Sequence, residues 1–521
     1  MILQRVGNAG IGLGTLFDRA ARRHPANILV LDHDLDVAPE LGRRLTITEV
    51  ADLVADIASR LWAAGVRPGE RIVVYKNDCF DIPLIAFAAN RIGAVPVLLS
   101  PKLPGDVVSQ LLARIENAYL CTDQVKLEQE LPETVGRLTR QILLTSGRHP
   151  GAVDLRSLRH APRVEPVATS PDHPALVTHT SGTTGLPKLA VHTSRTFEAR
   201  YRPQAAVASL VRKRRPVAMH VSFVHSRLVT AVAIAALRGF PIVVLREDEP
   251  EHVAEIFARI RPGVLEAHPN TFVKWERLAA DPRRPLASVK YFSSTFDAIH
   301  PRTVHRLLHA SGHRFPVFGQ LYGQSEVGPV VARAFTRRRR LSAKGGRCVG
   351  RTFPGMTSAR VVSRDGQAVS ADNPGYIEVR TDGRVLTYLG EDERYAGQLD
   401  GGWWRMGDLG YRTRSGRIYL LDREVDVIPG FGSTLAAEDV LFAGLDDLEE
   451  VVIVPGRDGR AVPVVCTVDD RRLDPEAWRA VTANLPPMAE PVHLRLEQLP
   501  QTATTKIKRL ELARSLGQEH S

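Results

Sequence analysis

The amino-acid sequence predicts an α/β protein with a large N-terminal domain of α/β sheets, a β-rich subdomain and a small α+β C-terminal domain. Three observations support this. Between residues 13 and 322, short apolar runs alternate with segments of helical periodicity, the rhythm of βαβ units. From 350 to 418 the predicted strands are short and Gly and Asp turns are frequent. The tail beyond 422–426 has strand patterns of its own, at 450–454 and 462–468.

The predicted elements of the first half follow from apolar spacing and turn residues. In order they are a helix at 13–22, a helix at 47–64 behind a Thr48 cap, a strand at 72–75, a helix at 83–91, and buried strands at 94–99 and 174–177. The second half continues with further α/β units. The segment 217–225 precedes a helix at 229–238, and then come a strand at 242–245, a helix at 251–261, a strand at 289–294, a helix at 302–310 and a strand at 317–322. We therefore predict an N-terminal domain over 1–422, with its β-rich subdomain at about 350–422, and a C-terminal domain over 423–521.

Composition narrows the class of protein. A chain of 521 residues with 44% hydrophobic and 24% charged residues has the make-up of a globular protein with a large core. Its net charge of +11 favours anionic partners, and nucleotide or CoA phosphates suit it as well as nucleic acid does. The basic runs at 212–215 and 337–340 lack interleaved aromatic residues, so nucleic-acid binding is not predicted.

Cysteine usage and hydropathy indicate a compartment. The four cysteines are far apart, which excludes a CxxC metal site and argues against a disulfide framework. The N-terminus has no signal-peptide pattern, and no apolar run approaches about 18 residues. We expect a cytoplasmic protein without membrane contact.

Residues 178–188 (Thr-His-Thr-Ser-Gly-Thr-Thr-Gly-Leu-Pro-Lys) have the character of a phosphate-binding loop. Glycine lets successive backbone amides approach an anion, hydroxyls add donors, and lysine adds a point charge. This is not a Walker-type loop, because Leu-Pro-Lys follows the last glycine. An ordinary Ser/Thr/Gly turn is the alternative. The candidate ligands are Thr180, Ser181, Gly182, Thr183, Thr184, Gly185 and Lys188.

Residues 322–326 (Tyr-Gly-Gln-Ser-Glu) follow a predicted strand, at the end of a sheet where ligands of open α/β folds bind. Glu326 is a candidate Mg²⁺ ligand, because magnesium is usually held by carboxylates together with substrate phosphates. Ser325 is a candidate phosphate donor, and Tyr322 and Gly323 are candidate nucleotide contacts. A loop with a capping Ser and Glu is the alternative.

Three further segments carry candidate residues. Asp408, between glycines in 402–410, can accept both ribose hydroxyls of a nucleotide. Lys506 is presented by a Thr-rich loop within 499–509, which on composition alone is equally a surface loop. His225 precedes an apolar helix, where a histidine is more often structural.

Together these segments, in this order, resemble the motifs of the adenylate-forming superfamily, which includes acyl-CoA synthetases, peptide-synthetase adenylation domains and luciferases. The segments at 65–75 and 93–101 also resemble its structural motifs. The resemblance implies that Lys506 is catalytic, that Arg423 contacts the nucleotide, and that His225 lies beside the acyl carboxylate. It places Thr295, Phe296 and Asp297 in the adenine-binding loop, and Gly430 or Gly432 in a pantetheine tunnel.

The chain departs from the family pattern at several positions. The family more often has Gly for Leu189, Gly and Glu for Phe296 and Asp297, Thr for Met406, a hinge Asp or Lys for Val425, and Gly for Thr505. A β-branched residue pays strain at positive φ, so Thr505 would penalise aiming of the catalytic lysine if the loop needs that conformation. The alternative is that a small shift of the loop accommodates Thr505.

The resemblance implies an acyl-CoA ligase. A carboxylic acid and Mg·ATP give an acyl-adenylate and pyrophosphate, and CoA then displaces AMP while a mobile C-terminal domain rotates between the two half-reactions. The implied cofactors are ATP/AMP, Mg²⁺ and CoA, and the implied partner is a small carboxylic acid or its acyl-adenylate, with a homodimer left open. The alternatives are a member specialised for the thioester-forming step, one that loads a carrier-protein pantetheine, and a non-catalytic ligand-binding relative. Phe223, Phe292 and Trp275 favour an apolar acid.

Overall fold

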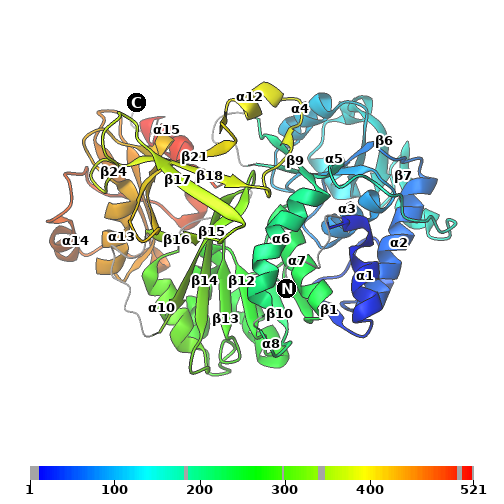
Figure 1. Ribbon diagram of the computed structural model, residues 1–521, viewed down its shortest axis with the longest axis horizontal. Helices are drawn as coiled ribbons and strands as arrows, with labels where there is room; N and C mark the ends of the chain where they lie inside the picture. The colour runs from blue at the N-terminus through cyan, green and yellow to red at the C-terminus, as the bar shows by residue number, and fades with distance from the viewer. Residues whose placement is uncertain are drawn as a thin grey trace. The chain divides into compact units, whose positions relative to one another are not determined.

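The computed structural model describes residues 11–180, 186–209, 211–295, 299–337, 347–501 and 507–518. The chain forms two compact units, whose elements Figure 1 colours in chain order. The first unit comprises residues 1–266, 325–328 and 381–397, and the second comprises 267–324, 329–380 and 398–521. Each unit is therefore assembled from segments distant in sequence. The domain boundary near residue 422 lies inside the second unit and stays a prediction.

A mostly parallel sheet forms one half of the first unit. Among the described residues its strand order is β19-β9-β8-β4-β3-β5-β6-β7, and β9 runs antiparallel to both of its neighbours. The strands are β3 Arg71–Val74, β4 Val95–Leu98, β5 Ala118–Thr122, β6 Thr139–Leu144, β7 Ala152–Asp154, β8 Pro174–His179, β9 Leu189–Thr193 and β19 Thr387–Tyr388. Its helices are α2 Ile47–Ala63, α3 Asp81–Arg91, α4 Gly105–Ile115 and α5 Gln124–Gln129. Strands buried on both faces read as continuous apolar runs, which is why the sequence reveals them.

The other strands of the first unit are ordered β2-β1-β11-β10-β12 within the described chain. Their bounds are β1 Ile28–Leu31, β2 Arg44–Thr46, β10 Val217–His220, β11 Ile242–Val244 and β12 Val264–Ala267. The associated helices are α1 Leu16–Arg23, α6 Ser194–Ala208, α7 Ser226–Arg238, α8 Pro250–Ile260 and the short α12 Asp392–Ala396. Helices α6 and α7 run side by side (Figure 1).

The cap of α2 differs from the sequence prediction. The helix begins at Ile47, and its N-cap is Thr46 rather than Thr48. Thr46 accepts the amide of Glu49 at 3.2 Å, while the Glu49 carboxylate accepts the Thr46 amide at 2.6 Å. This reciprocal arrangement satisfies two helix-end donors, so it outcompetes a cap two residues later. Thr48 instead donates to the carbonyl of Pro25 at 3.3 Å.

The second unit is richer in strands. Within the described residues its larger sheet is ordered β17-β18-β21-β22-β16-β15-β14-β13, with β20 beside β21. The strands are β13 Tyr291–Ser294, β14 Val317–Gln324, β15 Gly328–Thr336, β16 Cys348–Thr352, β17 Thr357–Val362, β18 Gly375–Thr381, β20 Leu399–Asp400, β21 Trp403–Arg412 and β22 Ile418–Arg423. Helices α9 Pro269–Lys274 and α10 Pro301–Ala310 accompany them. The predicted strand at 317–322 thus continues to Gln324.

The C-terminal part of the second unit has cores of its own. Strands β23 Leu448–Pro455, β24 Ala461–Thr467 and β25 Val492–His493 form a small sheet. Helices α13 Thr434–Gly444, α14 Pro475–Thr482 and α15 Arg509–Gln518 cover it, burying apolar clusters such as those around Leu441 and Val464. The predicted mixed α/β class with a small α+β C-terminal region is confirmed. In the described part of the chain, no helix is both long and apolar enough to cross a membrane.

Candidate active site

The carboxylate of Glu326 is the centre of a buried polar group in the first unit. Its side chain is 8% exposed, and Oε1 accepts a hydrogen bond from the Tyr388 hydroxyl at 2.6 Å. Lys188 Nζ lies 3.2 Å from the same oxygen and donates to the Tyr388 hydroxyl at 2.9 Å. Burial and the Glu326 charge raise the pKa of Tyr388 far above its usual range, so the phenol keeps its proton. The group thus joins one anion, one cation and one neutral donor.

Strand pairing explains why these side chains meet. Lys188 directly precedes β9, and β19 pairs antiparallel with β9 so that Tyr388 lies opposite Ala190. The amide of Thr180 donates to the carbonyl of Lys188 at 2.9 Å, which holds the ends of the predicted phosphate loop together. Tyr388 carries no motif, and its contact with Lys188 spans 200 positions, so sequence reasoning missed it.

Arg200, on α6, anchors the segment that carries Ser325 and Glu326. Its side chain is 3% exposed, and it donates to the carbonyls of Ser325 at 2.8 Å and Gly383 at 2.7 Å. Burial lowers the pKa of Arg200 to about 9, which still leaves it charged at neutral pH. Gly328 has φ +67°, and a Cβ there would lie 2.7 Å from the guanidinium Nε. Arg200 therefore positions the site, and Gly328 makes room for it.

His225 is placed beside Ser325. It is the N-cap residue of α7, where its Nδ1 accepts the amide of Arg227 at 3.0 Å. Its other ring nitrogen, Nε2, lies 3.1 Å from the Ser325 hydroxyl. The sequence-predicted residues His225, Ser325, Glu326 and Lys188 thus all belong to one region of the first unit.

A second group of predicted residues comes together in the second unit. The Tyr322 hydroxyl donates to Asp408 Oδ2 at 2.6 Å, and Arg423 Nε lies 3.6 Å from Asp408 Oδ1. The register of β21 and β22 sets Asp408 opposite Arg423. Burial and the Asp408 charge raise the pKa of Tyr322, so it remains a donor. An acidic oxygen flanked by a phenol and a guanidinium suits the hydroxyls and phosphate of a nucleotide.

The remaining predicted residues are placed in part. Ser181, Gly182, Thr183, Thr184, Gly185, Phe296, Asp297, Thr505 and Lys506 lie outside the described residues. Gly323 lies in β14, half-buried. Thr180 and Thr295 are each 7% exposed, and among the described residues neither buried Oγ1 has a hydrogen-bond partner.

Residues of the predicted hinge and acid pocket are also located. Val425 is 54% exposed in a short 3-10 turn, Glu424–Asp426. Gly430 and Gly432 have φ of +77° and +87°, so backbone geometry does not choose between them as tunnel glycine. The three aromatic residues taken to favour an apolar acid are buried against other rings: Phe223 against Phe80, Phe292 against Phe318, and Trp275 against Phe272.

His179 lies at the end of β8, directly before the candidate ligands of the predicted phosphate loop, and we expect it to make the stability of the fold depend on pH. Its Nε2 accepts the Ser100 amide at 3.1 Å, and burial lowers its pKa to about 4 from an ordinary 6.5. The folded state therefore binds this proton less tightly than the unfolded state, so stability falls as pH drops from 6.5 towards 4. His179→Gln keeps an acceptor for Ser100 but cannot titrate.

We expect the melting temperature of His179→Gln to fall less between pH 6.5 and 4 than that of the wild type. The exposed His160→Gln is the matched control and should leave the profile unchanged. Parallel profiles for all three proteins would contradict the role of His179.

Comparison with known proteins identifies the family. The family model described as AMP-binding enzyme matches residues 17–389. A 3-amino-2-hydroxy-4-methoxybenzoate diazotase from Streptomyces cremeus is 46% identical over 538 residues, covering 98% of this chain and 97% of the relative. This chain belongs to the AMP-binding, adenylate-forming enzyme superfamily.

Relatives of other activities share the fold. 4-Coumarate–CoA ligase 2 of Oryza sativa subsp. japonica is 27% identical over 528 residues, covering 92% of this chain and 89% of the relative. The crystal structure of the anthranilate CoA ligase AuaEII with anthranoyl-AMP superposes with a TM-score of 0.82 at 18% identity, covering 100% of this chain and 99% of that one. Both are similar along almost the whole chain, so the fold alone does not separate a diazotase from a CoA ligase.

Proposed function

We propose that this enzyme is an ATP-dependent diazotase, which uses nitrite to convert the amino group of an aminobenzoate into a diazonium. The observation that carries the proposal is the 46% identity with the Streptomyces cremeus diazotase over nearly the full length of both chains. Identity with the 4-coumarate–CoA ligase is 27%. Specificity for one acceptor depends on many contacts along the chain, so the higher full-length identity favours the diazotase activity.

The chemistry fits a site that forms adenylates. An oxygen of nitrite attacks the α-phosphorus of ATP as a carboxylate oxygen would, pyrophosphate leaves, and a nitrous–adenylic mixed anhydride results. The aryl amine nitrogen then attacks the nitrogen of the anhydride. The bond between the anhydride nitrogen and the AMP oxygen breaks, AMP leaves, the amine loses a proton, and a nitrosamine remains. The nitrosamine tautomerises to a diazohydroxide, which loses hydroxide to give the diazonium. The nitrite nitrogen is reduced and the amine nitrogen is oxidised as the two join in the diazonium, so no further oxidant is needed.

The described residues have matching roles. In the first unit, Lys188 would neutralise phosphate oxygens. In the second unit, Tyr322, Asp408 and Arg423 offer contacts that suit the hydroxyls and phosphate of a nucleotide. The Glu326 carboxylate fits Mg²⁺, a hard cation that prefers such oxygens and would neutralise charge on the leaving pyrophosphate. His225, 3.1 Å from the Ser325 hydroxyl, is the candidate acceptor of the amine proton.

The test supplies purified full-length enzyme with Mg·ATP, nitrite and a panel of aminobenzoates above neutral pH. Nitrous acid diazotises amines spontaneously in acid, so reactions lacking ATP are the control. We expect AMP that depends on both nitrite and amine, and a diazonium that couples to a naphthol dye and carries label from ¹⁵N-nitrite. Turnover that is independent of nitrite would overturn the proposal.

An acyl-CoA ligase is the second candidate, supported by the likeness to 4-coumarate–CoA ligase 2. The same panel with CoA in place of nitrite tests it, because a ligase yields AMP and a thioester detectable by mass. Carrier-protein loading and specialisation for the thioester step are variants of this candidate, distinguished by supplying a carrier protein or a synthetic acyl-adenylate. If no reaction yields AMP, the alternative that remains is that the protein is a non-catalytic, ligand-binding relative.

A further inference from the structure

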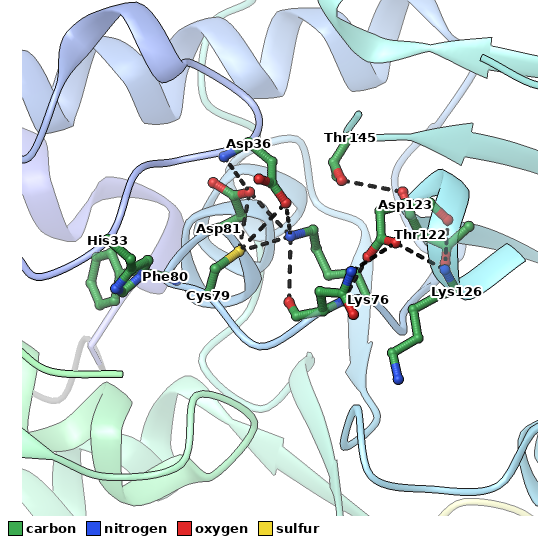
Figure 2. A network of polar contacts seen from close by, with 11 residues as sticks. His33, Asp36, Lys76, Cys79, Phe80, Asp81, Thr122, Asp123, Lys126 and Thr145 are labelled. Atoms are coloured by element: carbon green, nitrogen blue, oxygen red, sulfur yellow. Dashed lines mark hydrogen bonds and ion pairs between the residues drawn. The ribbon is translucent and has the colours of Figure 1, made fainter. Parts of the chain in front are cut away.

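A lysine and a cysteine meet in the interior of the first unit. After β3 the chain turns through Lys76 and Cys79 into α3, and these side chains are 0% and 3% exposed. Lys76 Nζ lies 2.7 Å from Cys79 Sγ, 2.8 Å from Asp36 Oδ2 and 3.2 Å from Asp81 Oδ2. Figure 2 shows the ammonium at the centre of these three side chains.

The nitrogen–sulfur distance is the notable feature. An N–H···O hydrogen bond usually spans about 2.9–3.0 Å, and sulfur is larger than oxygen, so an N–H···S bond is longer. The distance of 2.7 Å between Lys76 Nζ and Cys79 Sγ is shorter than the usual length of either kind of hydrogen bond. Single bonds between light atoms are about 1.5 Å long, so two of them joined at one atom span roughly 2.5 Å, and slightly more when one atom is sulfur. One oxygen atom therefore fits between Nζ and Sγ.

The surroundings favour oxidation over metal binding. Asp36, Cys79 and Asp81 have the ligand spacing of a metal site, but the Lys76 ammonium already supplies the cation. Cys79 Sγ lies 3.2 Å from Asp81 Oδ2, and Asp81 Oδ1 is buried without a hydrogen-bond partner among the described residues. These carboxylate oxygens can accept the protons that oxidation releases. The Asp36 side chain is 38% exposed, so the cluster reaches the protein surface on that side.

We propose that Lys76 and Cys79 form a covalent N–O–S bridge when the protein is exposed to hydrogen peroxide. One peroxide converts the thiol to a sulfenic acid and water. Lys76 gives a proton to the Asp81 carboxylate 3.2 Å away, and a second peroxide converts the resulting amine to a hydroxylamine and water. Condensation of the two releases a third water and leaves one oxygen between nitrogen and sulfur. Four electrons pass to the two peroxides. Two molecules of a dithiol reductant return the four electrons, which regenerates the thiol and the amine and releases the bridging oxygen as water. Burial raises the pKa of the Cys79 thiol. Burial lowers the pKa of Lys76, but the charges of Asp81 and Asp36 outweigh it and raise that pKa, so both groups are protonated, and bridging is slow and needs excess oxidant.

The test treats the full-length protein with peroxide until Cys79 no longer reacts with a thiol label after unfolding. Trypsin ordinarily cuts after Arg71, Lys76 and Arg91. The bridge blocks the cut after Lys76, so we expect a peptide of residues 72–91 that is heavier by about 14 Da, one oxygen gained and two hydrogens lost. Dithiothreitol should restore the mass and the cleavage.

Two variants complete the experiment. Cys79→Ser should lose the mass shift, while Cys466→Ser, which removes another buried thiol, should retain it. Lysine methylation has the same nominal mass but survives both reductant and Cys79→Ser, so persistence of the shift in either condition overturns the proposal. Oxidation of Cys79 only to sulfinic acid, with cleavage after Lys76 intact, overturns it as well. The reductant reversal in the wild type decides the matter even where a variant fails to fold.

Discussion

Replacing Arg227 by methionine should lower the free energy of unfolding by about 3–5 kcal/mol, the usual cost of leaving a buried charge without its partner. Arg227 and Glu266 are 7% and 6% exposed, and Arg227 Nη2 donates to Glu266 Oε2 at 2.6 Å. A second guanidinium nitrogen, Nε, pairs with Glu266 Oε1, and Nη1 donates to Gln204. Methionine fills much of the volume of the arginine side chain, so the loss of free energy of unfolding comes from the unpaired charge of Glu266 rather than from a cavity.

Two controls separate this pair from a general effect of removing arginine. The double variant Arg227→Met/Glu266→Leu should regain most of the loss, because well-packed apolar residues often replace a buried ion pair at little cost. Arg195→Met breaks an exposed pair with Asp172 and should leave the urea midpoint unchanged. The urea midpoint of the first unfolding transition measures all three. A double variant as unstable as Arg227→Met would show that the residual charge on Glu266 is not the cause.

The fold was predictable where the pattern is local. Buried parallel strands such as β3 and β4 are continuous apolar runs, and α7 shows helical spacing between a cap and a glycine. Caps are harder to predict because neighbouring residues compete, as Thr46 and Thr48 show. The assembly of each compact unit from distant segments leaves no local signal, since it depends on which strands pair.

The candidate site combines residues that local motifs indicate with residues that they do not. Lys188, Glu326, Asp408 and Arg423 stand in contiguous motifs, and the structure brings Lys188 to Glu326 and Asp408 to Arg423. Tyr388 and Arg200 stand in no motif. They contribute through contacts over 200 and 183 positions, with Lys188 and with the Gly383 carbonyl, and only tertiary structure reveals those.

Glu326 makes contacts that depend on its charge and contacts that do not, so a glutamine of nearly the same shape can test the charge alone. The carboxylate pairs with Lys188 and accepts a hydrogen bond from the Tyr388 hydroxyl. The backbone carbonyl of Glu326 separately accepts a hydrogen bond from the Val385 amide at 2.7 Å. Glu326→Gln retains the backbone contact and an oxygen for Tyr388. It removes the negative charge that would hold Mg²⁺ and face Lys188.

We therefore expect Glu326→Gln to lower nitrite- and amine-dependent AMP formation by roughly 10²–10³-fold, the usual cost of losing one preorganised electrostatic contact. A role in holding Mg²⁺ also predicts a higher Mg²⁺ requirement. The melting temperature should stay close to that of the wild type, because the Lys188 side chain is 22% exposed, unlike the buried partners of the Arg227 pair, and water can solvate its charge. The control is Glu198→Gln, which neutralises a buried glutamate paired with Arg202 on α6 and should keep near-normal turnover. Wild-type turnover and Mg²⁺ dependence in Glu326→Gln would refute the metal role. A large loss of melting temperature with normal turnover would make Glu326 a structural residue, because the same charge would then stabilise the fold without taking part in the reaction.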